Sequence, residues 1–145
     1  MADIKEQTQG FSLKDKSVLL LGVGGLGCNI AVHLAGAGIG KLMLCDFDTV
    51  SESNLNRQFL YTLNDIGKEK AVCAQEKLKL YAPECDISAW IGQIRKADEL
   101  EFAKDCDLLL CDGQYSEKEW PHRSRFGHST WTIAARLAAA SNAKQ

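Results

Sequence analysis

The sequence has little of what marks a membrane, secreted or nucleic-acid-binding protein. Only two of its 145 residues are proline, and no stretch approaches the ~20 apolar residues that a membrane-spanning helix needs. Residues 1–11 lack the apolar centre of a signal peptide. No basic block marks a nucleic-acid surface, and 17 basic against 19 acidic residues leave a net charge of −2. We therefore expect a cytoplasmic protein with neither a membrane nor a nucleic acid as partner.

The cysteines also lack an expected pattern, because no C-x-x-C pair occurs among the six of them. A disulfide framework is one interpretation. The apolar runs around the cysteines favour the other, small buried thiols in a reducing compartment. None has an adjacent base or an electropositive neighbourhood in the sequence, so we predict no nucleophilic role. The positions are Cys28, Cys45, Cys73, Cys85, Cys106 and Cys111.

What is present is the composition of one globular domain, with 46% hydrophobic and 25% charged residues. Continuous apolar runs predict strands buried on both faces, and helical spacing lies between them. This alternation predicts an α/β, Rossmann-like, doubly wound fold: a mainly parallel sheet with helices on both faces. The predicted strands are 17–22, 41–46, 86–92 and 106–112, and the predicted helices are 26–40, 65–81, 96–105 and 131–143. In the helix 65–81 we expect Ala71, Ala74, Leu78 and Tyr81 on the buried side.

A glycine turn, GVGGLG, stands where the first strand meets the first helix. Gly22 permits the sharp turn, Gly24 lets the backbone approach a phosphate, and Gly27 brings helix and strand close together. The helix N-terminus that follows favours an anion. Asp46 ends the second strand, where a dinucleotide-binding unit places the acid that holds ribose hydroxyls. To this point an NAD site and an ATP site explain the sequence equally well.

The stretch DFDTVSESNLNRQF, residues 46–59, separates the two readings. A nicotinamide site needs no arginine and amides beyond the ribose acid, whereas an ATP site must also neutralise the β- and γ-phosphates. Arg57 offers a bidentate fork for phosphate oxygens, and Lys70 on the next helix adds a point charge. Asp48 has two open roles, holding ribose or helping to bind magnesium. The amides that can fix the phosphates are Asn54, Asn56 and Gln58.

Together these motifs resemble the ThiF/MoeB/HesA family, the relatives of ubiquitin-activating enzymes, over residues 13–111. The resemblance rests on the glycine turn, the D-x-D strand end, NLNRQ and the G-x-x-K that ends at Lys70. It implies ATP and Mg²⁺ as cofactors and adenylation of the C-terminal glycine of a ubiquitin-like sulfur-carrier protein, with a homodimer as the assembly. It also implies that Arg57 and Lys70 act in catalysis. The implied ATP site is Gly22, Gly24, Gly25, Gly27, Asp46, Asp48, Asn54, Asn56, Arg57, Gln58 and Lys70.

Three features of that family are missing. Residues 1–12 hold no arginine to offer a neighbouring site, and no later cysteine pair, acceptor cysteine or carrier-gripping strand follows. The magnesium aspartate of the family pattern D-x-x-D-N falls on Gln114. Asp112 is two residues away, which displaces a carboxylate by about 6–7 Å on an extended chain. We therefore expect a catalytically incomplete chain. A non-catalytic nucleotide-binding or interaction domain is the alternative, and an NAD(P)-dependent oxidoreductase is a third.

Residues 107–145 resemble a late fragment of the metallo-β-lactamase fold, through LLLCDGQYSEKEW, GHSTW and the alanine-rich helix. The H-x-H-x-D-H cluster of that family is absent from the sequence. We therefore interpret His122 and His128 as loop and N-cap neighbours, and the chain as a fusion. The expected organisation is a lead-in at 1–12, an ATP-binding half at 13–111, and a non-matching loop and helix at 112–145 packed on the same domain.

Overall fold

The computed structural model describes residues 12–94, 97–123 and 128–144. Strands and helices alternate through the first half of the chain, and three 3-10 helices lie in the connections. The strands are β1 (Ser17–Leu21), β2 (Lys41–Asp46), β3 (Asp86–Ile91) and β4 (Leu108–Leu110). The α-helices are α2 (Gly25–Gly36), α3 (Lys70–Tyr81), α4 (Trp120–Arg123) and α5 (Trp131–Ser141). The 3-10 helices are η1 (Glu52–Asn54), η2 (Leu63–Asp65) and η3 (Ala97–Ala103).

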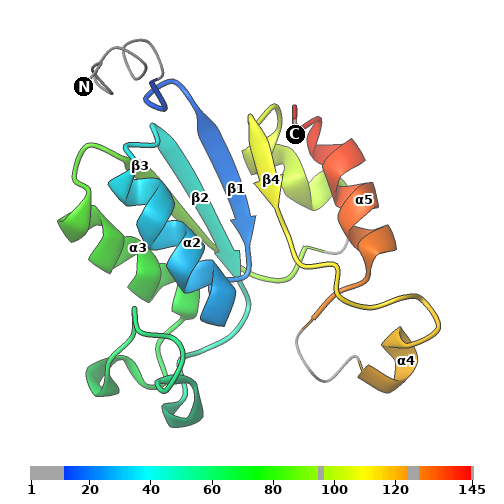
Figure 1. The fold of residues 1–145 in the computed structure, drawn as a ribbon, viewed down its shortest axis with the longest axis horizontal. Coiled ribbons are helices and arrows are strands. Elements are labelled where there is room, and N and C mark those ends of the chain that lie inside the picture. The colour runs from blue at the N-terminus through cyan, green and yellow to red at the C-terminus, as the bar shows by residue number, and fades with distance from the viewer. Residues whose placement is uncertain (1–11, 95–96, 124–127, 145) are drawn as a thin grey trace, which may run out of the picture.

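The four strands form one parallel sheet in the order β3-β2-β1-β4, which confirms the predicted fold class (Figure 1). The chain adds β2 and β3 on one side of β1 and then crosses to add β4 on the other side. The strand order therefore reverses between β1 and β4. Ligands of open α/β sheets bind beside such a reversal, outside the carboxyl ends of the strands.

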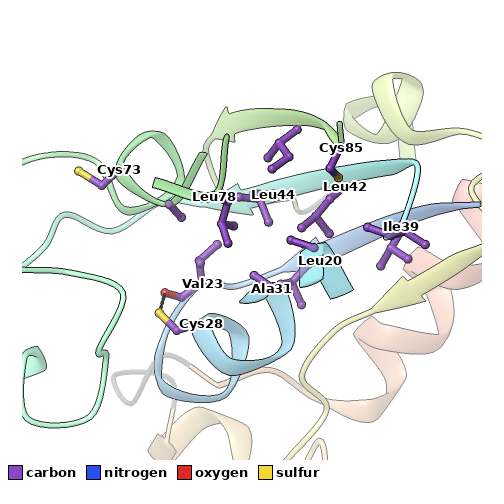
Figure 2. Packing of buried hydrophobic residues seen from close by; sticks show 14 of the residues in the cluster. Leu20, Val23, Cys28, Ala31, Ile39, Leu42, Leu44, Cys73, Leu78 and Cys85 are labelled. Atoms are coloured by element: carbon purple, nitrogen blue, oxygen red, sulfur yellow. Dashed lines mark hydrogen bonds between the residues drawn. The ribbon is translucent and has the colours of Figure 1, made fainter. Parts of the chain in front are cut away.

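Both faces of the sheet are buried, which is why its strands are continuous apolar runs. Val18 and Leu20 pack with residues of α2 and α3 in one cluster, part of which Figure 2 shows. Leu19 packs on the opposite face, with Leu100 of η3 and Leu137 of α5. Helices therefore cover both faces, as the sequence pattern predicts (Figure 1).

Several boundaries and one burial prediction are wrong. The predicted helix 65–81 begins only at Lys70, because Gly67 has a positive φ of 84° and η2 ends at Asp65 in a capping box with Thr62. The predicted strand 106–112 forms ladder pairs only over Leu108–Leu110. Tyr81 is 61% exposed rather than buried, because the buried stripe of α3 continues from Leu78 to Ala82 instead.

The first helix is shorter than predicted: α2 ends at Gly36, and Gly38 with a φ of 81° turns the chain toward β2. The C-terminal helix ends at Ser141, because Asn142 takes the left-handed conformation. The segment predicted as a helix over 96–105 is the 3-10 helix η3, and Lys96 lies outside the described residues. No helix among the described residues has the length and apolar character needed to cross a membrane.

Candidate functional site

A cavity of about 350 Å³ opens at the carboxyl ends of the four strands. Each strand end contributes to its wall: Gly22 after β1, Asp46 on β2, Gly92 after β3 and Asp112 after β4. The cavity therefore lies beside the reversal of strand order. Because parallel strands bring their carboxyl ends to one edge, residues distant in sequence meet here.

The glycine turn forms the centre of this wall. Gly22 has a φ of 97°, and its N–H donates to the Cys45 carbonyl at 2.7 Å. Gly24 is the N-cap of α2, so the first turn of the helix starts at the cavity. A Cβ on Gly27 would lie 2.0 Å from the Gly22 carbonyl oxygen. Gly27 therefore allows the close approach of helix and strand, whereas Gly22, Gly24 and Gly25 line the cavity.

Asp46 is held rigidly beside the glycine turn. Its side chain accepts hydrogen bonds from the Val23 N–H at 2.7 Å and from the Asp48 N–H at 2.8 Å, one on each carboxylate oxygen. Asp46 is 8% exposed, and it lines the cavity. The contact with Val23 ties the end of β2 to the turn after β1, so the carboxylate position is defined by backbone donors.

Lys70, the first residue of α3, brings a buried ammonium to the cavity. Its Nζ donates to Asp48 Oδ2 at 3.0 Å; the lysine side chain is 6% exposed and that of Asp48 is 51% exposed. Tyr61 supports the backbone here, since its hydroxyl donates to the Val23 carbonyl at 2.7 Å and lies 3.3 Å from the Lys70 carbonyl. A buried cation with one solvated counter-ion is suited to an anionic ligand.

Arg57 is fixed by its neighbours in the loop after η1. Its Nη1 donates to the Ser53 carbonyl at 2.9 Å and to Asn56 Oδ1 at 3.1 Å. Its aliphatic carbons lie beside Gly25, 3.9 Å from the position of a Cβ there. Asn56 does not line the cavity, so it orients the guanidinium rather than facing a ligand.

Gln58 carries a buried side-chain oxygen without a hydrogen-bond partner beside the glycine turn. The residue is 4% exposed, and its Oε1 has no hydrogen-bond partner among the described residues. Its amide lies next to Gly24, and both residues line the cavity. An unsatisfied buried amide costs about 1–3 kcal/mol, so such groups call for an explanation.

The segment after β4 closes the other side of the cavity. Asp112 Oδ2 accepts from the Ser129 N–H at 2.8 Å and lies 3.0 Å from His128 Nδ1. Gln114 pairs with Thr130 through an isolated bridge and does not line the cavity. The sequence-based interpretation of His128 as an N-cap neighbour is correct as far as it goes, since Thr130 is the N-cap of α5. It missed the contact between His128 and Asp112.

The model of the ThiF family matches residues 1–113. This chain belongs to the ThiF family. It is 38% identical over 98 residues to a probable molybdopterin-synthase adenylyltransferase of Porphyra purpurea, covering 68% of this chain and 26% of that one. It is 37% identical over 98 residues to a sulfur carrier protein adenylyltransferase of Thermus thermophilus, covering 68% of this chain and 36% of that one.

Solved structures agree with the ThiF assignment. PaaA superposes with a TM-score of 0.71 at 27% identity, covering 89% of this chain and 35% of that one. MccB of E. coli in complex with ATP superposes with a TM-score of 0.66 at 28% identity, covering 80% of this chain and 36% of that one. The ThiF chain described here thus spans about a quarter to a third of the length of these relatives.

The ThiF cavity brings together most of the residues that the sequence predicts for a nucleotide site. Gly27 and Asn56 are the two predicted residues that do not line it, and each supports a neighbour that does. His128 and Ser129 were not predicted, because only the pairing of segments 112–115 and 128–131 brings them to the wall. The predicted residues that line the cavity are Gly22, Gly24, Gly25, Asp46, Asp48, Asn54, Arg57, Gln58 and Lys70.

Among the residues that the structure describes, this cavity of the ThiF chain holds no activated thiol and no prepared metal site. All six cysteines carry free thiols; five are buried, as predicted, whereas Cys111 is half-buried. Burial raises the pKa of the Cys45 thiol to about 12, and it also raises the pKa of the Cys111 thiol; both residues line the cavity. Within residues 12–94, 97–123 and 128–144, no three His, Cys, Asp or Glu side chains form a group that could hold a metal.

Proposed function

We propose that this chain is the ATP-binding half of a ThiF-type adenylyltransferase, which activates the C-terminal glycine of a ubiquitin-like sulfur-carrier protein. The observation that carries the proposal is the buried Lys70 ammonium at the glycine turn, next to Arg57 and the unsatisfied amide of Gln58. The relatives named as adenylyltransferases of molybdopterin synthase and of a sulfur carrier protein support the reaction class.

In the proposed complex each wall residue has a distinct task. Asp46 accepts hydrogen bonds from the ribose hydroxyls, and the glycine turn with the start of α2 binds the phosphate that follows. Arg57 and Lys70 neutralise the terminal phosphates. A carboxylate oxygen of the carrier then attacks the α-phosphorus, and the bond to the bridging oxygen of the leaving pyrophosphate breaks. The chain contributes positioning and charge stabilisation to this step.

The described residues do not by themselves form the magnesium site that the family implies. Asp48 is paired with Lys70, and the position of the family's aspartate is occupied by Gln114, outside the cavity. When bound, magnesium would neutralise charge on the phosphates; such an ion is commonly held by the phosphates, water and one or two carboxylates. We assign no residue of this chain to the ion.

The setting and the assembly follow from the same proposal. The free buried thiols support a cytoplasmic location, because reducing compartments keep thiols from pairing. We propose a homodimer as the assembly, on the resemblance to the family alone. The carrier protein would contact the cavity on the side of β4, where the attacking carboxylate must reach the α-phosphate.

Calorimetric titration with ATP and with NAD tests this proposal against an oxidoreductase. The proposal expects tighter binding of ATP, because Arg57 and Lys70 supply charges that only the β- and γ-phosphates require. A chain that binds NAD more tightly than ATP would show that the glycine turn serves a dinucleotide. A chain that binds neither would remove the nucleotide function altogether.

A further inference from the structure

Two acidic side chains flank the glycine turn at the same level of the sheet. Leu21 pairs with Cys45, so Gly22 and Asp46 follow side by side at the ends of β1 and β2. On the other side of β1, β4 pairs with it up to Leu20 and Leu110, and the chain then continues to Asp112 at the same cavity. Asp46, the glycine turn and Asp112 thus form a row across three strand ends, and all of them line the cavity.

Two cations within residues 1–113 line the cavity, and both lie on one side of this row. Arg57 and Lys70 both belong to segments that follow β2, and Lys70 is bonded to Asp48 there. On the β4 side, the lining residues of the described chain include Asp112, His128 and Ser129 and no lysine or arginine. A phosphate oxygen that faces β4 would therefore meet the Asp112 carboxylate unless His128 stands between them.

His128 is held in a position suited to that role. Its Nδ1 lies 3.0 Å from Asp112 Oδ2, and its ring packs edge-on against Tyr115 with centroids 5.9 Å apart. The backbone pairs there as well, since the Tyr115 N–H donates to the Ser129 carbonyl at 3.0 Å. With Nδ1 engaged by Asp112, the ring keeps Nε2 for a ligand. The side chain is 43% exposed, so a ligand in the cavity can reach it.

We propose that His128, oriented by Asp112, donates a hydrogen bond from Nε2 to the α-phosphate of the bound nucleotide. This inference rests on the proposed ATP-binding function. The α-phosphate follows directly on the ribose at Asp46 and so lies over the glycine turn, within the row that ends at Asp112. A histidine ring that donates from both nitrogens contacts the Asp112 carboxylate through Nδ1 and the phosphate through Nε2. Arg57 and Lys70 serve the terminal phosphates from the opposite side.

The contact would come from a part of the chain outside the family pattern. The family model matches residues 1–113, whereas His128 and Ser129 lie beyond that range. The segment after β4 would therefore supply a nucleotide contact of its own, rather than only covering the sheet.

The test compares ATP, AMP and adenosine by calorimetry, with the wild-type chain, the variant His128→Ala and the control His122→Ala. His122 lies exposed on α4 and does not line the cavity. We expect His128→Ala to weaken the binding of ATP and of AMP about ten-fold, the low end for a hydrogen bond to a charged group. The affinity for adenosine should not change. His122→Ala should alter none of the three affinities.

A second measurement uses the wild-type chain alone. The imidazole signals of His128, assigned by their loss in the variant, should shift on addition of AMP and stay in place with adenosine. Unchanged AMP affinity in the variant, or an equal loss for adenosine, would overturn the inference while leaving ATP binding intact. Failure of the wild-type chain to bind ATP would instead overturn the proposed function, and this inference with it.

Discussion

The role of a charged side chain in this protein depends on what already holds it in place. Lys68 and Lys70 stand two residues apart in the sequence. The Lys68 side chain is 57% exposed and pairs with Asp65, whereas that of Lys70 is 6% exposed and lines the cavity. Gly67 turns the chain before α3, so that the helix begins with Lys70 against the end of β2. One turn thus decides which ammonium is available to a phosphate.

Replacing Arg57 by alanine should weaken ATP binding by about 1.5–3 kcal/mol, the usual scale for a hydrogen bond to a charged group. Its Nη1 is engaged by Ser53 and Asn56, which leaves the other guanidinium nitrogens for phosphate oxygens. Calorimetry measures the loss, and Arg136→Ala is the matched control because Arg136 is exposed on α5 outside the cavity. An unchanged affinity for ATP would mean that Arg57 only stabilises its own loop.

At the scale of elements, one carboxylate joins η2 to α3. The side chain of Asp65 accepts from the N–H and the hydroxyl of Thr62, both at 2.8 Å, and it also pairs with Lys77 on α3. The Lys77 ammonium, together with the Thr62 donors, holds the pKa of the Asp65 carboxyl well below its usual range. The ionised form is therefore favoured in the folded state, and this contribution to stability is present above the ordinary aspartate pKa.

Stability should consequently fall as the pH drops below about 4, the ordinary aspartate pKa, and part of that fall should disappear in Asp65→Asn. The variant should be less stable than the wild type at pH 7, and the difference should narrow by pH 3, where the wild-type carboxylate begins to lose its advantage. Urea denaturation at the two pH values measures this. A constant difference between the two proteins would show that the network does not depend on the charge.

The approach of α2 to β1 is also decided at a single position. A Cβ on Gly27 would meet the backbone of Gly22, whereas a Cβ on Gly36 of the same helix would meet the hydroxyl of Tyr81 at 2.9 Å. Tyr81 is 61% exposed and can move aside. We expect Gly27→Ala to lower the free energy of unfolding by about 3 kcal/mol or more. Gly36→Ala should stay within about 1 kcal/mol of the wild type, since alanine favours helix.

Urea denaturation of both variants provides the comparison. If Gly27→Ala lost as little stability as Gly36→Ala, α2 and β1 would be able to move apart at little cost. The expected result would instead show that the glycine turn is held in place by backbone packing, before any nucleotide binds.

At the scale of the whole molecule, this chain matches only part of the length of its relatives. It covers 26% and 36% of the two adenylyltransferases described above. Gln114, where the resemblance implies an aspartate in the family pattern, pairs with Thr130 outside the cavity. The first of these features bears on how the carrier is held, and the second bears on the charge of the phosphates. Neither bears on binding of the nucleoside.

We therefore expect the purified chain to bind ATP but to catalyse carrier-dependent pyrophosphate exchange at least ~10²–10³-fold more slowly than an intact relative, the usual cost of one lost charge contact in the transition state. The measurement uses labelled pyrophosphate and a panel of ubiquitin-like carriers, with an intact ThiF-family adenylyltransferase as the reference. A rate equal to the reference would show that the nucleotide half suffices. Gln114→Asp should not restore exchange, because residue 114 does not line the cavity.

The amino-acid sequence by itself determined the parallel sheet and the glycine turn. Strands buried on both faces require continuous apolar runs, and the turn between β1 and α2 requires glycine at Gly22 and Gly27. These requirements are local, so they can be recognised without knowing what lies nearby. The sequence also predicted Asp46, Arg57 and Lys70 as parts of one site, because they belong to motifs that occur together in one family. Their exact tasks stay predictions.

Only the tertiary structure decided what the end of the chain contributes. His128 stands two residues before the N-cap of α5 in sequence, and its contact with Asp112 depends on the pairing of two segments that flank α4. The distinction between Asn54, which lines the cavity, and Asn56, which turns to Arg57, is likewise set by side-chain direction in a loop. Such contacts join residues whose separation has no fixed period, so no pattern along the chain encodes them.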